Sequence, residues 1–136
     1  MTAQSHPKLR WRYYRTAQGN SPVERELDDL SDEDHAVVTA AMRLVRTYGL
    51  RAAKPLRGDL YEVVAHGPDQ GFRVFFAPEG RHGQVLLALE LFSKKSQETP
   101  RRKLQLAEDR LKDWRERGQQ LRAERGKQPR HRADGA

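Results

Sequence analysis

The sequence predicts a single α+β domain in which a helix hairpin packs on a curved, mostly antiparallel sheet. Three observations indicate this fold: an alternating segment near the N-terminus, two consecutive helix-start signals, and three short apolar segments followed by a last helix. The expected order of elements is therefore β-α-α-β-β-β-α. At 136 residues the chain is long enough for one hydrophobic core and too short for a deep two-domain cleft.

The N-terminal third is predicted to form one strand and the helix hairpin. Residues 9–15 alternate between apolar and basic side chains, which is the pattern of a half-buried strand. Ser21 is followed by proline, and a glutamate stands three residues after the serine, so a short helix is expected from there to about Leu30. Ser31 and the acidic residues after it begin a second helix, which should end at Tyr48 before a glycine.

The rest of the chain is predicted to form a meander of three strands and a C-terminal helix. The three strand segments are separated by runs of turn residues: residues 59–66, 72–78 and 85–92. A helix should begin after Pro100, with apolar residues at helical spacing up to Trp114. Beyond Gly118 the chain is basic and poor in apolar residues. We therefore expect a domain over residues 1–118 and a basic tail over residues 119–136, which begins as a frayed helix and passes into disorder.

The composition excludes several classes of protein. There is no cysteine, which removes disulfides, zinc–thiolate sites, iron–sulfur clusters and thiol nucleophiles. No apolar run approaches the roughly 20 residues that span a bilayer, and the N-terminus lacks the pattern of a signal peptide. No two of the five histidines stand four residues apart, so no metal site is expected. These features together predict a cytoplasmic protein without metal or cofactor.

The charge of the chain is unevenly distributed. Lys and Arg number 26 against 19 Asp and Glu, a net charge of +7. Residues 24–34 hold seven acidic side chains and one arginine, a local charge of −6 that leaves +13 for the remainder. A basic molecule with one acidic edge could present an oriented face to a nucleic acid. The alternative is an arginine-rich composition inherited from a high-GC genome, without any contact with nucleic acid.

A group of cations in the predicted sheet half is the candidate site. Its members are Lys54, Arg57, Arg73, Lys94, Lys95, Arg101 and Arg102. Arg73 interrupts an apolar strand and must point away from the face of its neighbours Phe72 and Val74. In a buried position it would need a structural partner such as Glu62 or Glu90. In a basic concavity it could instead bind a phosphate and stabilise a pentavalent transition state.

The order and spacing of these residues resemble the RelE/ParE superfamily, and within it the HigB-type and phage-derived toxins. The resemblance covers about residues 9–117. The segments that carry it are Lys54-Pro-Leu-Arg-Gly-Asp-Leu-Tyr-Glu62, Phe72-Arg-Val-Phe-Phe76, Leu91-Phe-Ser-Lys-Lys95 and the Thr99-Pro100 start of a helix that contains Ala107.

The resemblance implies the toxin of a type II toxin–antitoxin pair, a ribosome-dependent mRNA endonuclease that works in the ribosomal A site. The nucleophile would be the ribose 2′-hydroxyl of the RNA. Arg73 matches the strand arginine that stabilises the scissile phosphate, Lys94 and Lys95 match the basic pair after the last strand, and Lys54 and Arg57 match the cationic loop. The implied protein partner is a HigA-type antitoxin with a helix-turn-helix domain that represses the shared operon.

Two departures from the family pattern leave the proton-transfer residue open. Val64 stands where many relatives have an arginine, and Glu90 stands where many have a histidine. Glu90 could act as the general base, and His66 lies on the same strand face as Val64. Two other functions remain open: a ParE-like toxin that binds gyrase without cutting anything, and an inactive module that binds RNA or an antitoxin.

Overall fold

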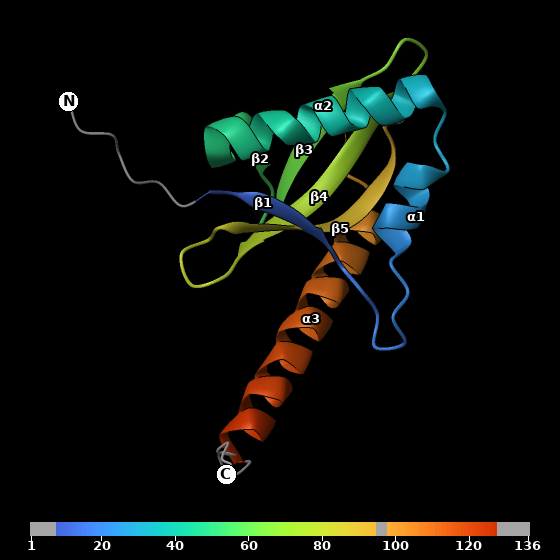
Figure 1. Cartoon of the computed structure of the whole chain (residues 1–136). Helices are drawn as coiled ribbons and strands as arrows, with labels where there is room; N and C mark the ends of the chain where they lie inside the picture. Colours follow the sequence, from blue (N-terminus) through green and yellow to red (C-terminus); the bar gives the residue numbers. More distant parts are fainter. Residues whose placement is uncertain (1–7, 95–97, 128–136) are drawn as a thin grey trace, which may run out of the picture.

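The structure, a computed structural model, describes residues 8–94 and 98–127 and has the predicted α+β architecture (Figure 1). The elements in chain order are β1 (Arg10–Tyr13), α1 (Pro22–Asp28), α2 (Asp32–Tyr48), the 3-10 helix η1 (Gly49–Ala52), β2 (Lys54–Pro55), β3 (Tyr61–His66), β4 (Gly71–Glu79), β5 (Val85–Lys94) and α3 (Arg101–Lys127). The 3-10 helix η1 and the two-residue strand β2 are the additions to the predicted order.

A five-stranded sheet in the order β1-β5-β4-β3-β2 forms the centre of the molecule. Strands β2 to β5 pair antiparallel, as the predicted meander requires, while β1 pairs parallel with β5. Helices α1 and α2 cover one face and α3 covers the other, so each face has its own apolar core. This is why β5 is buried along its first seven residues, of which the first five form a continuous apolar run.

The helix-start signals have different outcomes. The Ser31 hydroxyl accepts a hydrogen bond from the backbone N–H of Asp34 at 3.1 Å, so the predicted cap of α2 is confirmed. The capping box predicted at Ser21 is wrong, because the Ser21 side chain makes no capping hydrogen bond to α1. Proline at the first position still favours the start of α1, since its fixed φ suits a helix and its missing N–H is not needed there.

The last helix continues past the expected domain boundary. It runs through Gly118 to Lys127 and projects beyond the sheet (Figure 1). Residues 119–126 are helical but exposed, which fits a mostly polar segment whose one large apolar side chain, Leu121, is 55% exposed. The expected boundary after Gly118 is therefore not an end of secondary structure, and residues 128–136 of the expected tail lie outside the described residues.

A cluster of polar side chains links the middle of α3 to Tyr14, the residue after β1. The Tyr14 hydroxyl donates to Asp113 Oδ2 at 2.5 Å, and Arg117 donates to the same oxygen through Nη2 at 2.9 Å. The hydrogen bond from Arg117, followed by that from Tyr14, lowers the pKa of Asp113 below its usual range. Burial, followed by the hydrogen bond to Asp113, raises the pKa of Tyr14. The cluster therefore favours an ionised Asp113 and a protonated Tyr14.

Candidate functional site

The pairing register of the sheet brings most of the predicted site residues to the face that α3 covers. Side chains on neighbouring strands that face each other in register lie on the same side of the sheet. Three rows follow from the register on this face: Lys54, Glu62, Phe75 and Glu90; then Val64, Arg73 and Phe92; then His66, Gly71 and Lys94. The predicted cations Lys54, Arg73 and Lys94 are thus gathered from three different strands.

A bulge in β5 turns Glu90 toward α3. The register shifts between Phe75 and Phe76, which pair with Glu90 and Ala88, so Leu89 is an extra residue on β5. Leu89 packs in the core beneath α3, and Glu90 hydrogen-bonds to side chains of α3. Two consecutive residues consequently face the same helix, which strict alternation of side chains would not allow.

Arg73 is buried between the sheet and the segment that precedes α3. Its side chain is 3% exposed, and its Nε lies 3.5 Å from Glu62 Oε2, whose side chain is 4% exposed. Its Nη1 donates to the backbone carbonyl of Glu98 at 3.1 Å. Of the two environments open to Arg73 from sequence, the buried one is found, with Glu62 rather than Glu90 as the neighbouring carboxylate. The guanidinium also holds the segment that leads into α3.

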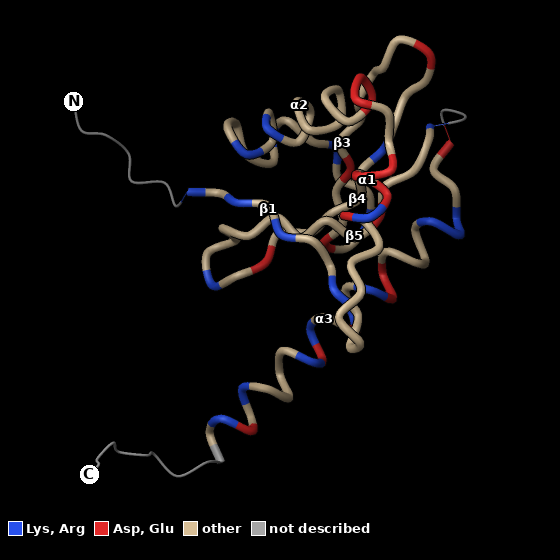
Figure 2. The backbone as a smooth tube through the Cα atoms, turned by 45° about the vertical axis from the view of Figure 1, so that its right-hand side comes forward, with Lys and Arg blue, Asp and Glu red and all other residues tan. Residues whose placement is uncertain are grey.

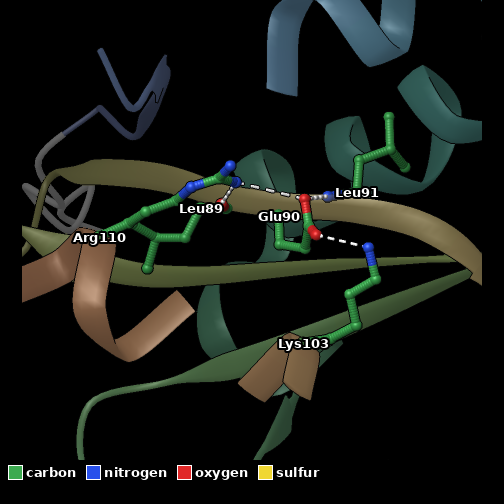
Figure 3. A network of polar contacts seen from close by, with 5 residues as sticks. All are labelled: Leu89, Glu90, Leu91, Lys103 and Arg110. Carbon is green, nitrogen blue, oxygen red and sulfur yellow. Dashed lines mark hydrogen bonds and ion pairs between the residues drawn. The ribbon is translucent and has the colours of Figure 1, made fainter. Parts of the chain in front are cut away.

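Glu90 is held by three donors (Figure 3). Lys103 Nζ lies 2.8 Å from Oε2, while Oε1 accepts from Arg110 Nη1 at 3.3 Å and from the backbone N–H of Leu91 at 3.1 Å. Arg110 also donates to the carbonyl of Leu89 at 2.8 Å. Both carboxylate oxygens are occupied, and two cations favour the charged form. This geometry suits a structural anchor between β5 and α3 better than a general base, which must accept a proton.

Lys103 and Arg110 were not among the residues predicted from the sequence. The available signal was helical spacing, because both lie within four residues of Ala107, which is fully buried beneath α3. The carboxylate that they meet could not be foreseen, since it depends on the bulge in β5.

In the third row, the residue on the middle strand β4 is a glycine and carries no side chain. His66 is exposed and Lys94 is half-buried, and Gly71 stands between them without a side chain. The Lys94 Cδ lies 3.8 Å from where a Gly71 Cβ would stand, so the lysine side chain leans over the glycine. An imidazole and an ammonium group therefore share the row next to that of Arg73.

The remaining predicted cations are placed around this face. Arg57 donates to both carboxylate oxygens of Glu108, through Nε at 2.7 Å and Nη2 at 2.6 Å, so its charge is matched. Arg101 and Arg102 are exposed on the first turn of α3. Lys95 lies outside the described residues.

A groove of about 840 Å³ opens beside the Glu90 anchor. Its lining comes from the end of β5, the first half of α3 and Glu26 of α1, and includes Phe92, Arg102 and Lys103. The Lys103 ammonium also lies 5.3 Å from the centre of the Phe92 ring. Figure 2 shows acidic residues gathered at α1 and the start of α2, and basic residues spread over β1 and α3. The acidic segment therefore lies mainly on α1 and α2, and Glu26 is its member that reaches the groove.

The sequence of the chain matches a known protein family. Residues 25–112 match the family described as phage derived protein Gp49-like. The chain belongs to this family. It is also 36% identical over 107 residues to "Probable endoribonuclease HigB1" of Mycobacterium tuberculosis, in strains CDC 1551 / Oshkosh and ATCC 25618 / H37Rv. The match covers 76% of this chain and 83% of the relative. The resemblance to HigB-type and phage-derived toxins is confirmed.

Within residues 8–94 and 98–127, no helix combines the length and apolar character needed to cross a membrane. Over the same residues, no group of three or more His, Asp or Glu side chains is arranged to hold a metal ion.

Proposed function

We propose that this Gp49-like protein is the toxin of a type II toxin–antitoxin pair and cleaves mRNA in the ribosomal A site, which arrests translation and growth. The observation that carries the proposal is the placement of Lys54, Arg73 and Lys94 on one face of the sheet. The name of the mycobacterial relative supports RNA cleavage as the reaction. An arrangement made mostly of cations suits a reaction on a phosphodiester.

The chemistry needs no nucleophile from the protein. The ribose 2′-oxygen attacks the adjacent phosphorus, and the bond from phosphorus to the 5′-oxygen of the next nucleotide breaks. The products are a 2′,3′-cyclic phosphate and a 5′-hydroxyl. One proton leaves the 2′-hydroxyl and one reaches the departing 5′-oxygen. The protein has to align the RNA, stabilise the charge of the transition state and assist both proton transfers.

The proposed roles follow from the three rows of the sheet face. Lys54 and Lys94 contact RNA phosphates, and Arg73 supplies positive charge from its buried position on the same face of the sheet. Two strand spacings separate His66 from Lys94, about 10 Å between their Cα atoms, so we propose that one phosphodiester contacts both side chains. His66 is the proposed acceptor of the 2′-hydroxyl proton, since Glu90 is engaged by Lys103 and Arg110.

The proposed partners are the ribosome, its mRNA and an antitoxin encoded with the toxin. Arg101 and Arg102 are proposed to contact flanking RNA from the exposed start of α3, together with Lys95. The antitoxin is proposed to be of the HigA type, with a helix-turn-helix domain that represses the shared operon. The proposed site of action is the cytoplasm, where the ribosomes are.

A reconstituted system tests the activity. Purified ribosomes programmed with a defined mRNA are incubated with wild type, Lys94→Ala and the control Arg43→Ala, whose residue is exposed on α2 away from the sheet face. We expect wild type and Arg43→Ala to cut only ribosome-bound mRNA and to leave cyclic phosphate ends, while Lys94→Ala cuts much more slowly. Uncut mRNA with every variant, together with binding of the wild type to gyrase, would contradict the proposal.

A further inference from the structure

A second basic pocket lies at the far end of β4 from Arg73. It has a volume of about 530 Å³ and lies between the turn after β4 and the second half of α3. We call it the Trp114 pocket. The residues that line it are Glu79, Gly80, Arg81, Trp114, Arg115, Gly118, Gln119 and Arg122. Glu79 follows Arg73 by six positions along the strand, and at about 3.3 Å per residue the two sites are about 20 Å apart.

The pocket has unmatched positive charge. Three arginines and one glutamate line it, a net charge of +2. Glu79 is engaged by Arg115, whose Nη2 lies 2.6 Å away and whose Nη1 binds Asp59 at 2.9 Å. In the part of the chain that the structure describes, neither Arg81 nor Arg122 forms an ion pair, and both are exposed. Two guanidinium groups at the mouth are therefore available to an anion.

Gly118 keeps the pocket open in the middle of a long helix. Glycine is a poor residue for a helix interior, because it has more backbone freedom to lose than any other residue. No close packing requires it here, since an added Cβ would meet only Arg122 Nη1, at 3.6 Å. Arg115, Gly118 and Arg122 stand at spacings of three and four residues and share one face of α3. The missing side chain leaves space between the two arginines.

An aromatic ring and a fourth arginine extend the pocket toward β1. The Arg12 guanidinium lies 5.2 Å from the centre of the Trp114 ring, and Arg12 is exposed on β1. Planar guanidinium groups bind phosphates through two donors, and aromatic rings beside them suit nucleotide bases. This combination favours an RNA strand over an acidic peptide. The basic residues of β1 and of α3 can be followed in Figure 2.

We propose that the Trp114 pocket binds the phosphate backbone of RNA, as a second contact at the opposite end of β4 from Arg73. The inference rests on the proposed function, because it takes RNA as the ligand of the protein. Two anchors about 20 Å apart, as estimated from the strand rise, would fix the direction of an RNA strand across the molecule. Arg81 and Arg122 contribute affinity and leave the chemistry to the other end of the sheet.

Binding to a fluorescent, fully 2′-O-methylated RNA oligonucleotide tests this assignment, since that RNA lacks the nucleophile and stays uncut. The full-length wild type is compared by anisotropy, over a range of salt concentrations, with the double variant Arg81→Ala/Arg122→Ala. The control Arg43→Ala/Arg46→Ala removes the same charge from exposed positions on α2, beyond the other face of the sheet. Circular dichroism checks that each variant keeps its helix content.

We expect the pocket variant to bind about tenfold more weakly at 0.1 M salt, with a plot of log K against log salt less steep by about 1.4, since each phosphate contact with a single strand contributes about 0.7. The α2 control should keep the wild-type slope. Gly118→Leu, which fills the pocket without changing charge, should also weaken binding.

The outcomes separate this inference from the proposed function. If the pocket variant and Gly118→Leu bind the RNA as wild type does, while wild type still cleaves ribosome-bound mRNA, the pocket assignment is wrong and the proposed function stands. If the variants bind RNA normally but lose binding to the antitoxin, the pocket takes an acidic protein segment instead, and the assignment fails. A wild type that neither binds nor cleaves RNA overturns both.

Discussion

Replacing Glu62 with glutamine should destabilise the protein by about 3 kcal/mol, because it leaves the Arg73 charge buried without its carboxylate. Both side chains are almost fully buried, at 3% and 4% exposed. Removing one partner of a buried pair typically costs about 3 to 5 kcal/mol. Arg73 keeps its hydrogen bond to the Glu98 carbonyl, which places the expected loss at the lower end. The amide has nearly the shape of the carboxylate, so the change isolates the charge.

Urea denaturation followed by circular dichroism measures the loss. With a slope of about 1.5 kcal/mol per molar, a loss of 3 kcal/mol lowers the midpoint by about 2 M. The matched control is Glu108→Gln, which breaks the exposed pair with Arg57 and should leave the midpoint near that of wild type. If Glu62→Gln shifts the midpoint no more than Glu108→Gln does, the carboxylate does not compensate the charge of Arg73, and this reasoning is wrong.

Three further predictions concern the helix α3, the candidate base and the response to pH. Gly118→Ala should stabilise the protein by about 0.5 to 1 kcal/mol in the same urea assay, because alanine suits a helix interior; a loss of stability would show that the helix needs glycine there. His66→Ala should slow cleavage of ribosome-bound mRNA by about 10² or more, the usual contribution of a general base, while Glu90→Gln keeps the wild-type rate; the reverse pattern would assign the base to Glu90. The hydrogen bond from Arg117 holds the pKa of Asp113 below its usual range, so the folded state binds a proton at Asp113 more weakly than the unfolded state does. The ionised Asp113 therefore stabilises the fold, and this stabilisation is lost as pH falls below about 4. Asp113→Asn should therefore show a smaller loss of stability between about pH 4 and pH 2 than wild type shows, and equal losses would remove Asp113 from the acid response.

The fold could be predicted because the signals for it are local. Alternation in residues 10–13, the serine cap of α2 and the turn-rich segments around β4 each depend on residues close together in sequence. Alternation also placed Arg73 on the face opposite Phe72 and Val74, where the structure has it. The capping box at Ser21 failed because the local pattern does not fix which way a side chain turns.

The candidate site could be predicted only in part, because its contacts join distant segments. Arg57 meets Glu108 across 51 residues of sequence, so the sequence shows two isolated charges where the structure has an ion pair. The bulge at Leu89 depends on how β4 and β5 pair, and it decides that Glu90 meets α3. From the sequence Glu90 was a candidate base, because its contacts with Lys103 and Arg110 cannot be seen there. In the structure these contacts make it an anchor between β5 and α3.

The most direct test of the account is to map the 5′ ends of cellular transcripts after brief induction of wild type and of Lys94→Ala. We expect new 5′ ends within translated regions, in register with codons, in cells with wild type. We expect few or none in cells with the variant, provided that both proteins accumulate equally. Growth arrest by wild type without new transcript ends would contradict mRNA cleavage as the activity of this protein.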